Sequence, residues 1–240
     1  WKERVFDIQK SYWGNWSDVS FETHTKTVSI LKQQLQDVRS KFDKQLKEVT
    51  VEGINSSPDG KDIFINTMQN VSLDCSDDMI CFTKEIMRES MRLLKKPPPC
   101  DFSMLAIGSL ARGEATPYSD LECLFLIERR NPEIEEYFER LAVTSYFLIG
   151  NLGETTLKYM AIAELEGWFH DCGISGFKID GLQKEAGNIP TGNGQPGTAN
   201  RFIVTAEELA ETHWQVLNNP EKETALRGDL TAMLRFTKTI

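Results

Sequence analysis

Two short apolar runs with a glycine-rich polar stretch between them constrain the fold of this chain more than any other feature. The first run covers residues 102–107 and the second covers residues 121–127. Between them stands the sequence Gly-Ser-Leu-Ala-Arg-Gly-Glu-Ala-Thr-Pro-Tyr-Ser-Asp, residues 108–120. Short apolar runs bounded by Pro, Gly or polar residues are typical of buried strands. The pattern therefore predicts two strands joined by a turn that carries polar side chains.

Helical periodicity surrounds these runs. Apolar residues recur at steps of three and four over residues 28–49 and again over residues 77–95, which predicts two amphipathic helices. Ser76 is the expected N-cap of the second helix, and Pro97-Pro98-Pro99 should end it. A third helix is predicted over about 133–148, with Pro132 in its first turn. The aromatic residues before the first helix are expected to pack on it: Trp13, Trp16 and Phe21.

The last third of the chain has weaker signals. Residues 176–180 form a candidate third strand, and residues 181–198 are rich in Gly, Pro and Asn, which predicts a loop. Residues 155–169 fit either a helix or a loop that contains one. A final helix should start near Thr205. Residues 234–240 keep a helical pattern, from which we expect the natural chain to continue into further domains.

The chain is acidic, with 36 Asp and Glu against 27 Lys and Arg and a net charge of -9. Because such a surface repels phosphate backbones, we do not expect long nucleic acid as a partner. No apolar stretch approaches the roughly 20 residues of a membrane span, so we expect no membrane association. The five cysteines form no C-x-x-C pair, which favours reduced thiols in a cytoplasmic protein.

Two carboxylates flank the start of the second apolar run. In a strand, Asp120 and Glu122 share one face, and Leu121 between them points into the core. Neighbouring carboxylates repel each other unless a cation lies between them. Oxygen ligands of this kind suit magnesium, with manganese as the alternative ion. Isolated acidic residues two positions apart also occur by chance on surface turns, and that interpretation stays open beside the metal site.

The turn before these carboxylates has the features of an anion site. Gly108 allows close approach to the backbone, and Ser109 adds a hydroxyl beside N–H groups at the start of a short helix. Arg112 can bind either a phosphate or a nearby carboxylate. Glu114 can hold Arg112 or cap the short helix, or it can contact metal-bound water.

The whole segment resembles the signature of the nucleotidyltransferase superfamily. It is most similar to the signature of bacterial signal-protein uridylyltransferases, glutamine-synthetase adenylyltransferases and their uncharacterised relatives. The matching positions are Gly108, Ser109, Arg112, Gly113, Glu114, Pro117, Tyr118, Ser119 and Asp120. The resemblance implies an α/β (α+β) fold, a small mixed sheet flanked by helices. This nucleotidyltransferase-like core would cover residues 100–205, between a helical N-terminal region (1–99) and a C-terminal helical segment (206–240).

The resemblance also implies roles for single residues. Asp120 and the acidic residue two positions later would bind two magnesium ions that hold a nucleoside triphosphate, and a third carboxylate would activate the acceptor. Asp180, at the end of the third candidate strand, fits that third role and a place among the metal ligands, or it is only a turn residue before Gly181. The expected nucleotide-binding residues are Gly108, Ser109, Arg112, Ser119 and Lys178. Arg201 could also contact the triphosphate. Residues 187–194 could close over the nucleotide or form only a flexible connection between two elements.

Three functions are compatible with this sequence. The first is magnesium-dependent transfer of a nucleoside monophosphate from a triphosphate to a protein or small-molecule acceptor. The second is a nucleotide-binding regulatory or scaffold module of a longer protein, with weak catalysis or none. Glu122 favours that module, because most similar proteins have Asp there and magnesium geometry is strict. The third is synthesis of a nucleotide second messenger, which the motif favours least.

Overall fold

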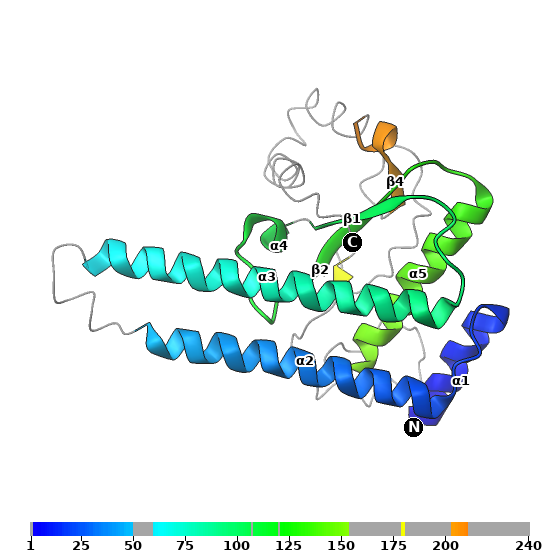
Figure 1. Ribbon diagram of the computed structural model, residues 1–240, viewed down its shortest axis with the longest axis horizontal. Helices are drawn as coiled ribbons and strands as arrows, with labels where there is room; N and C mark the ends of the chain where they lie inside the picture. Colours follow the sequence, from blue (N-terminus) through cyan, green and yellow to red (C-terminus); the bar gives the residue numbers. More distant parts are fainter. Residues whose placement is uncertain are drawn as a thin grey trace.

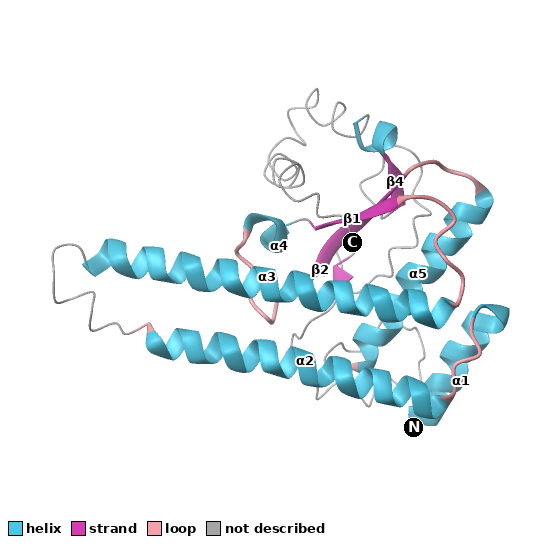
Figure 2. Cartoon of the chain, in the orientation of Figure 1, coloured by secondary structure: helices cyan, strands magenta, loops and turns pink. Residues whose placement is uncertain are grey.

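The structure is a computed structural model, and it describes residues 2–49, 60–106, 108–119, 121–153, 179–180 and 203–210. For residues 60, 122, 179 and 180 it describes the backbone alone. Four long helices and a small sheet make up most of this part of the chain (Figures 1 and 2). The long helices are α1 (Lys2–Trp13), α2 (Phe21–Glu48), α3 (Gly60–Leu94) and α5 (Pro132–Asn151), and α4 (Gly108–Arg112) is short.

The sheet is built around strand β2 (Leu121–Ile127). Strand β1 (Phe102–Ala106) runs antiparallel to it, with Phe102 opposite Ile127. Two further strands run parallel to β2: β3 (Ile179–Asp180) pairs with its first two residues and β4 (Ile203–Thr205) with its last three. This mixed sheet with flanking helices confirms the predicted fold class. Both strands predicted around the glycine-rich stretch form, and β4, an Ile-Val-Thr run, was not predicted.

Alternate residues of β2 pack on opposite faces of the sheet. Leu121, Cys123, Phe125 and Ile127 are buried in a large core that they share with all four long helices. The ring of Phe125 lies 5.5 Å from that of Phe138 on α5. Leu124 joins a small second cluster with Leu105 and Val204. The N-terminal helices therefore dock on the same core as the sheet.

Helices α2 and α3 form a long antiparallel hairpin that projects beyond the sheet (Figure 1). Helix α3 begins at Gly60, so the predicted start near residue 77 and the predicted cap at Ser76 are both wrong. Ser76 lies inside the helix, where its hydroxyl donates to the Ser72 carbonyl at 2.8 Å. The physical reason is that the apolar stripe continues through this position. Its buried residues are Val71, Cys75, Met79, Phe82 and Ile86.

Helix α2 starts earlier than its apolar pattern suggests. The Ser20 side chain caps it by accepting from the Thr23 N–H at 3.2 Å. Helix α1, which was not predicted, folds back on this end. Trp13 is fully buried, and its indole N–H donates to Thr144 Oγ1 on α5 at 3.0 Å. Of the aromatic residues predicted to pack on the first helix, Trp13 does so, with its ring 5.7 Å from that of His24 on α2. Phe21 is the first residue of α2 itself, and the Trp16 ring lies 6.1 Å from that of Tyr137 on α5.

The predicted third helix is confirmed as α5. The Asn131 side chain caps it by accepting from the Ile134 N–H at 2.9 Å, and Pro132 occupies the first turn. Residues 206–210 are helical, as predicted from Thr205 onwards. There, Thr205 and Glu208 form a reciprocal capping box, with N–H to side-chain oxygen distances of 3.0 and 3.3 Å.

Arg130, just after β2, attaches the 203–210 segment to the rest of the molecule. Its guanidinium donates to both carboxylate oxygens of Glu208, at 2.9 and 2.6 Å, and to the Ile203 carbonyl at 2.7 Å. It also forms an ion pair with Glu135 on α5. Because four acceptors converge on a side chain that is only 21% exposed, this cluster is a strong local anchor.

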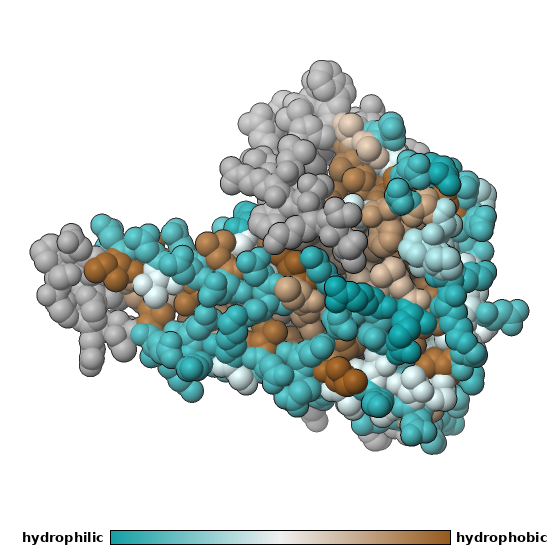
Figure 3. Space-filling view, viewed as in Figure 1, coloured by the Kyte–Doolittle hydropathy of each residue, from teal (hydrophilic) through white to brown (hydrophobic). Residues whose placement is uncertain are grey.

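Several predicted segments lie outside the described residues: 155–169, 181–198, and residues 176–178 of the third strand. Among the described helices, none is long and apolar enough to cross a membrane. Figure 3 shows a largely hydrophilic surface over α2 and α3, with apolar side chains scattered along it.

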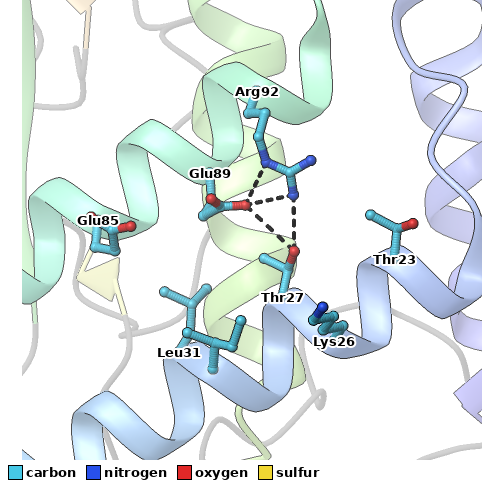
Figure 4. A pocket seen from close by; sticks show the side chains of 8 residues that line it. Thr23, Lys26, Thr27, Leu31, Glu85, Glu89 and Arg92 are labelled. Atoms are coloured by element: carbon cyan, nitrogen blue, oxygen red, sulfur yellow. Dashed lines mark hydrogen bonds and ion pairs between the residues drawn. The ribbon is translucent and has the colours of Figure 1, made fainter.

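A pocket of about 230 Å³ lies between α2 and α3. Figure 4 shows that Arg92 points across it and binds Glu89 and Thr27, at 2.6 and 2.9 Å. These polar groups satisfy one another, so the pocket shows the features of helix packing rather than of a binding site.

Candidate functional site

The glycine-rich turn becomes the start of helix α4. Gly108 is buried and has a φ of +59°, a conformation that favours glycine over residues with a Cβ. Ser109 is half-buried beside it. The backbone conformation at residue 108 therefore explains why glycine stands at this turn. The binding of phosphate by Gly108 and Ser109 stays a prediction.

A loop of residues 113–119, here called the signature loop, joins α4 to β2. Gly113 ends α4 with a φ of +74°, and the Glu114 N–H donates to the Ser109 carbonyl at 2.8 Å. At the other end, Ser119 Oγ accepts from the Thr116 N–H at 2.9 Å, and the Ser119 N–H donates to the Thr116 carbonyl at 3.0 Å. Ser119, predicted to bind nucleotide, thus also closes the turn that precedes residue 120.

Arg112 and Glu114 form an ion pair across the start of this loop. Arg112 Nε lies 2.8 Å from Glu114 Oε2, and the two side chains are 40% and 61% exposed. Of the alternatives for Glu114, the structure shows the one in which it holds Arg112. Because solvent screens an exposed pair, its contribution to stability is small. Its effect is to hold a positive charge next to the predicted anion site.

The predicted carboxylates belong to neighbouring strands. Glu122 and Asp180 are register partners on β2 and β3, so their Cα atoms are adjacent across a parallel strand pair. Adjacent strands lie about 4.8 Å apart. Asp120 and Lys178 lie outside the described residues, but Asp120 directly precedes Leu121, which is buried as predicted. The backbone positions of two predicted metal ligands, 58 residues apart in sequence, are therefore paired at the start of β2.

A pair of carboxylates in register has an electrostatic consequence. Like charges at paired positions of neighbouring strands destabilise the sheet unless a cation or a proton neutralises them. A divalent cation with oxygen ligands fits this donor set. Among the side chains that the structure describes, no three His, Cys, Asp or Glu residues gather into a metal-binding group. The metal site at residues 120, 122 and 180 accordingly stays a prediction.

Two residues that contact the signature loop were not recognised in the sequence. Ser76 on α3 accepts from the Ala115 N–H at 3.0 Å, and Arg39 on α2 lies over the Tyr118 ring, 4.5 Å from its centroid. Both come from helices distant in sequence from the loop. The only sequence signal is a serine in the apolar stripe of α3, which by itself indicates nothing about its partner.

Comparison with known families gives one match. Residues 67–155 match a family model described as "Putative nucleotidyltransferase DUF294". This part of the chain resembles a nucleotidyltransferase. The matched region, residues 67–155, contains most of α3, the strands β1 and β2, the signature loop and α5. The match supports the superfamily predicted from residues 108–120. No curated protein and no solved structure matches the chain.

Proposed function

We propose that this chain is a magnesium-dependent nucleotidyltransferase that moves a nucleoside monophosphate from a nucleoside triphosphate to a protein or small-molecule acceptor. The observation that carries the proposal is the register of Glu122 with Asp180 at the start of β2. Asp120 directly precedes this strand in the sequence. The match of residues 67–155 to a nucleotidyltransferase family supports the reaction type. Of the known branches, the Arg-Gly-Glu and Pro-Tyr-Ser-Asp elements favour the one that includes signal-protein uridylyltransferases and glutamine-synthetase adenylyltransferases.

In the proposed mechanism the tasks are divided among the parts of the site, and Asp180 has two of them, metal binding and proton acceptance. Asp120, Glu122 and Asp180 would hold the metal, while N–H groups at Gly108 and Ser109 would bind the triphosphate. Bound magnesium would neutralise phosphate charge and favour in-line displacement. The acceptor atom forms a bond to the α-phosphorus, the bond from that phosphorus to the bridging oxygen breaks, and pyrophosphate leaves. The acceptor's proton passes to the Asp180 carboxylate.

The acidic character of the chain supports the proposed class of acceptor. With a net charge of -9, a long nucleic acid would meet general repulsion. A protein side chain or a small molecule does not require an extended basic surface. Lys178 and Arg112 would supply the local positive charge for the triphosphate.

One observation favours a second candidate, a module that binds nucleotide without turnover. Position 122 is Glu, whose carboxylate stands one methylene farther from the backbone than that of Asp. Magnesium requires near-ideal octahedral geometry, so this difference bears on turnover more than on binding. Replacing Glu122 by Asp would then raise the rate of pyrophosphate release.

Calorimetry and a pyrophosphate assay together test both candidates. The protein is titrated with ATP, CTP, GTP and UTP, with and without magnesium, and pyrophosphate release is measured in parallel. We expect magnesium-dependent binding of at least one triphosphate. In Asp120→Ala and Asp180→Asn, the rate of pyrophosphate release should fall by roughly a hundredfold or more. Glu128→Gln is the matched control, because Glu128 directly follows β2 at its other end and pairs with Arg129.

The outcomes separate the candidates. Binding with pyrophosphate release supports the enzyme. Because release requires attack by an acceptor, binding without release supports the module when Glu122→Asp gains release under the same conditions. If the wild-type protein binds none of the four triphosphates, or if Asp120→Ala retains full binding and release, the assignment of the site is wrong.

A further inference from the structure

The signature loop rests on the α2–α3 hairpin at a buried hydrogen bond. Ser76 is 2% exposed, and its hydroxyl accepts from the Ala115 N–H at 3.0 Å while it donates to the Ser72 carbonyl at 2.8 Å. Ala115 is equally buried. A buried N–H without an acceptor is costly, so this hydroxyl satisfies a group that the loop cannot satisfy itself.

Helix α2 holds the next part of the same loop. The guanidinium of Arg39 lies over the ring of Tyr118 at 4.5 Å, and Nη2 donates to the Pro117 carbonyl at 3.4 Å. A cation over an aromatic face and a hydrogen bond to the adjacent carbonyl fix both the ring and the backbone. These contacts lie two and three residues before Asp120.

Gly113 brings the beginning of the loop against α3. A Cβ at Gly113 would lie 2.6 Å from Cδ2 of Leu73, so the backbone passes directly over that side chain. The hairpin therefore contacts the loop at residues 113, 115 and 117–118, which is nearly its whole length. Other polar contacts between α2 and α3, such as Gln45 Nε2 to Asp74 Oδ2 at 3.0 Å, hold the two helices together and involve no loop residue.

We propose that Arg39 and Ser76 are positioning residues, which set the conformation of the signature loop and through it the affinity of the neighbouring site for nucleoside triphosphate. This inference rests on the proposed function for its second half. The loop ends at Ser119, next to Asp120, so a shift of its backbone moves the carboxylate that would bind the metal. The α2–α3 hairpin is then a working part of the site as well as a part of the core.

Two readouts test the proposal on the full chain, one of them independent of nucleotide. Amide hydrogen exchange of residues 113–119 is measured without nucleotide in the wild type, Ser76→Ala, Arg39→Met and the control Gln45→Met. We expect exchange at the Ala115 amide to rise about tenfold in Ser76→Ala, and exchange at residues 117–119 to rise in Arg39→Met. The control should exchange like the wild type in this loop.

The second readout is the Kd for the triphosphate that binds best among ATP, CTP, GTP and UTP, with magnesium. We expect Arg39→Met to weaken binding about five- to tenfold and Arg39→Lys, which keeps a cation over Tyr118, to recover most of that loss. Melting temperatures of Arg39→Met and Gln45→Met should agree, which separates positioning from general destabilisation.

If loop exchange and Kd in both variants equal those of Gln45→Met, the inference is overturned and the proposed function is untouched. If the wild type binds no triphosphate, the proposed function fails, and the exchange measurement alone decides whether Arg39 and Ser76 position the loop. A loss of binding in Arg39→Lys as large as that in Arg39→Met would also contradict the role given to the cation.

Discussion

Acidification should destabilise this protein through one buried histidine. His24 on α2 is only 4% exposed, with the rings of Phe6 and Trp13 at 5.3 and 5.7 Å. Its Nε2 lies 3.0 Å from Asn151 Nδ2, and the same amide nitrogen donates to Gln9 Oε1 at 3.0 Å. Since the Asn151 amide group faces the ring as a donor, the ring nitrogen must accept, which requires the neutral imidazole.

The size of the effect follows from the pKa. Burial lowers the pKa of His24 from 6.5 to about 4. Below pH 6.5 the unfolded chain takes up a proton at this residue and the folded chain does not, so the free energy of unfolding falls as the pH falls. Each pH unit costs about 1.4 kcal/mol, which gives a loss of about 2 kcal/mol at about pH 5. The loss continues until the pH reaches the folded pKa of about 4.

Urea unfolding at about pH 7.5, 6.5 and 5 measures this loss. The control is His24→Gln, which keeps a polar side chain beside Asn151 but does not titrate. The wild type should lose about 2 kcal/mol more than the variant between the first and last pH. If the two proteins show the same pH dependence, His24 is not buried in its neutral form and the packing described for α1 and α2 is wrong.

Two further predictions concern the signature loop and the segment after β4. Gly113→Ala should lower the free energy of unfolding by about 1–2 kcal/mol, because a φ of +74° strains any residue with a Cβ; unchanged urea stability would contradict this conformation. Arg130→Met should lower the free energy of unfolding by about 2 kcal/mol and speed amide exchange in residues 203–210, since the Glu208 carboxylate loses its guanidinium partner. Arg129→Met, which removes only an exposed pair, should cost less than about 0.5 kcal/mol. Equal effects of the two arginine variants would show that Arg130 is no special anchor.

Local pattern predicted much of the fold and the chemical character of the site. The apolar runs around residues 102–107 and 121–127 predicted buried strands, and Pro132 with the apolar residues after it predicted α5. These features depend on residues close in sequence, and the periodicity of their apolar side chains indicates which face of the helix or strand is buried. The same is true of Gly108 and Gly113, where the backbone needs a conformation that glycine adopts most easily.

The sequence pattern gave a wrong prediction, or none, where the local structure depended on residues distant in the sequence. Ser76 has the residue type and flanking charges of an N-cap, yet it lies inside α3, because the buried apolar stripe of this helix continues through it from Val71 and the helix begins at Gly60. Its hydroxyl then serves Ala115, 39 residues away in the chain. The short β4 was missed because three β-branched residues form a strand only when β2 offers an unpaired edge.

The sequence by itself therefore determined the two strands, the turn residues between them and the residue types on which the predicted nucleotide and metal site depends. Only the tertiary structure decided that Glu122 stands in register with Asp180, and that Arg39 and Ser76 support the loop before Asp120. The physical reason is that composition and periodicity encode which side chains leave water. Which distant backbone and side-chain groups then meet is settled by packing the whole core at once.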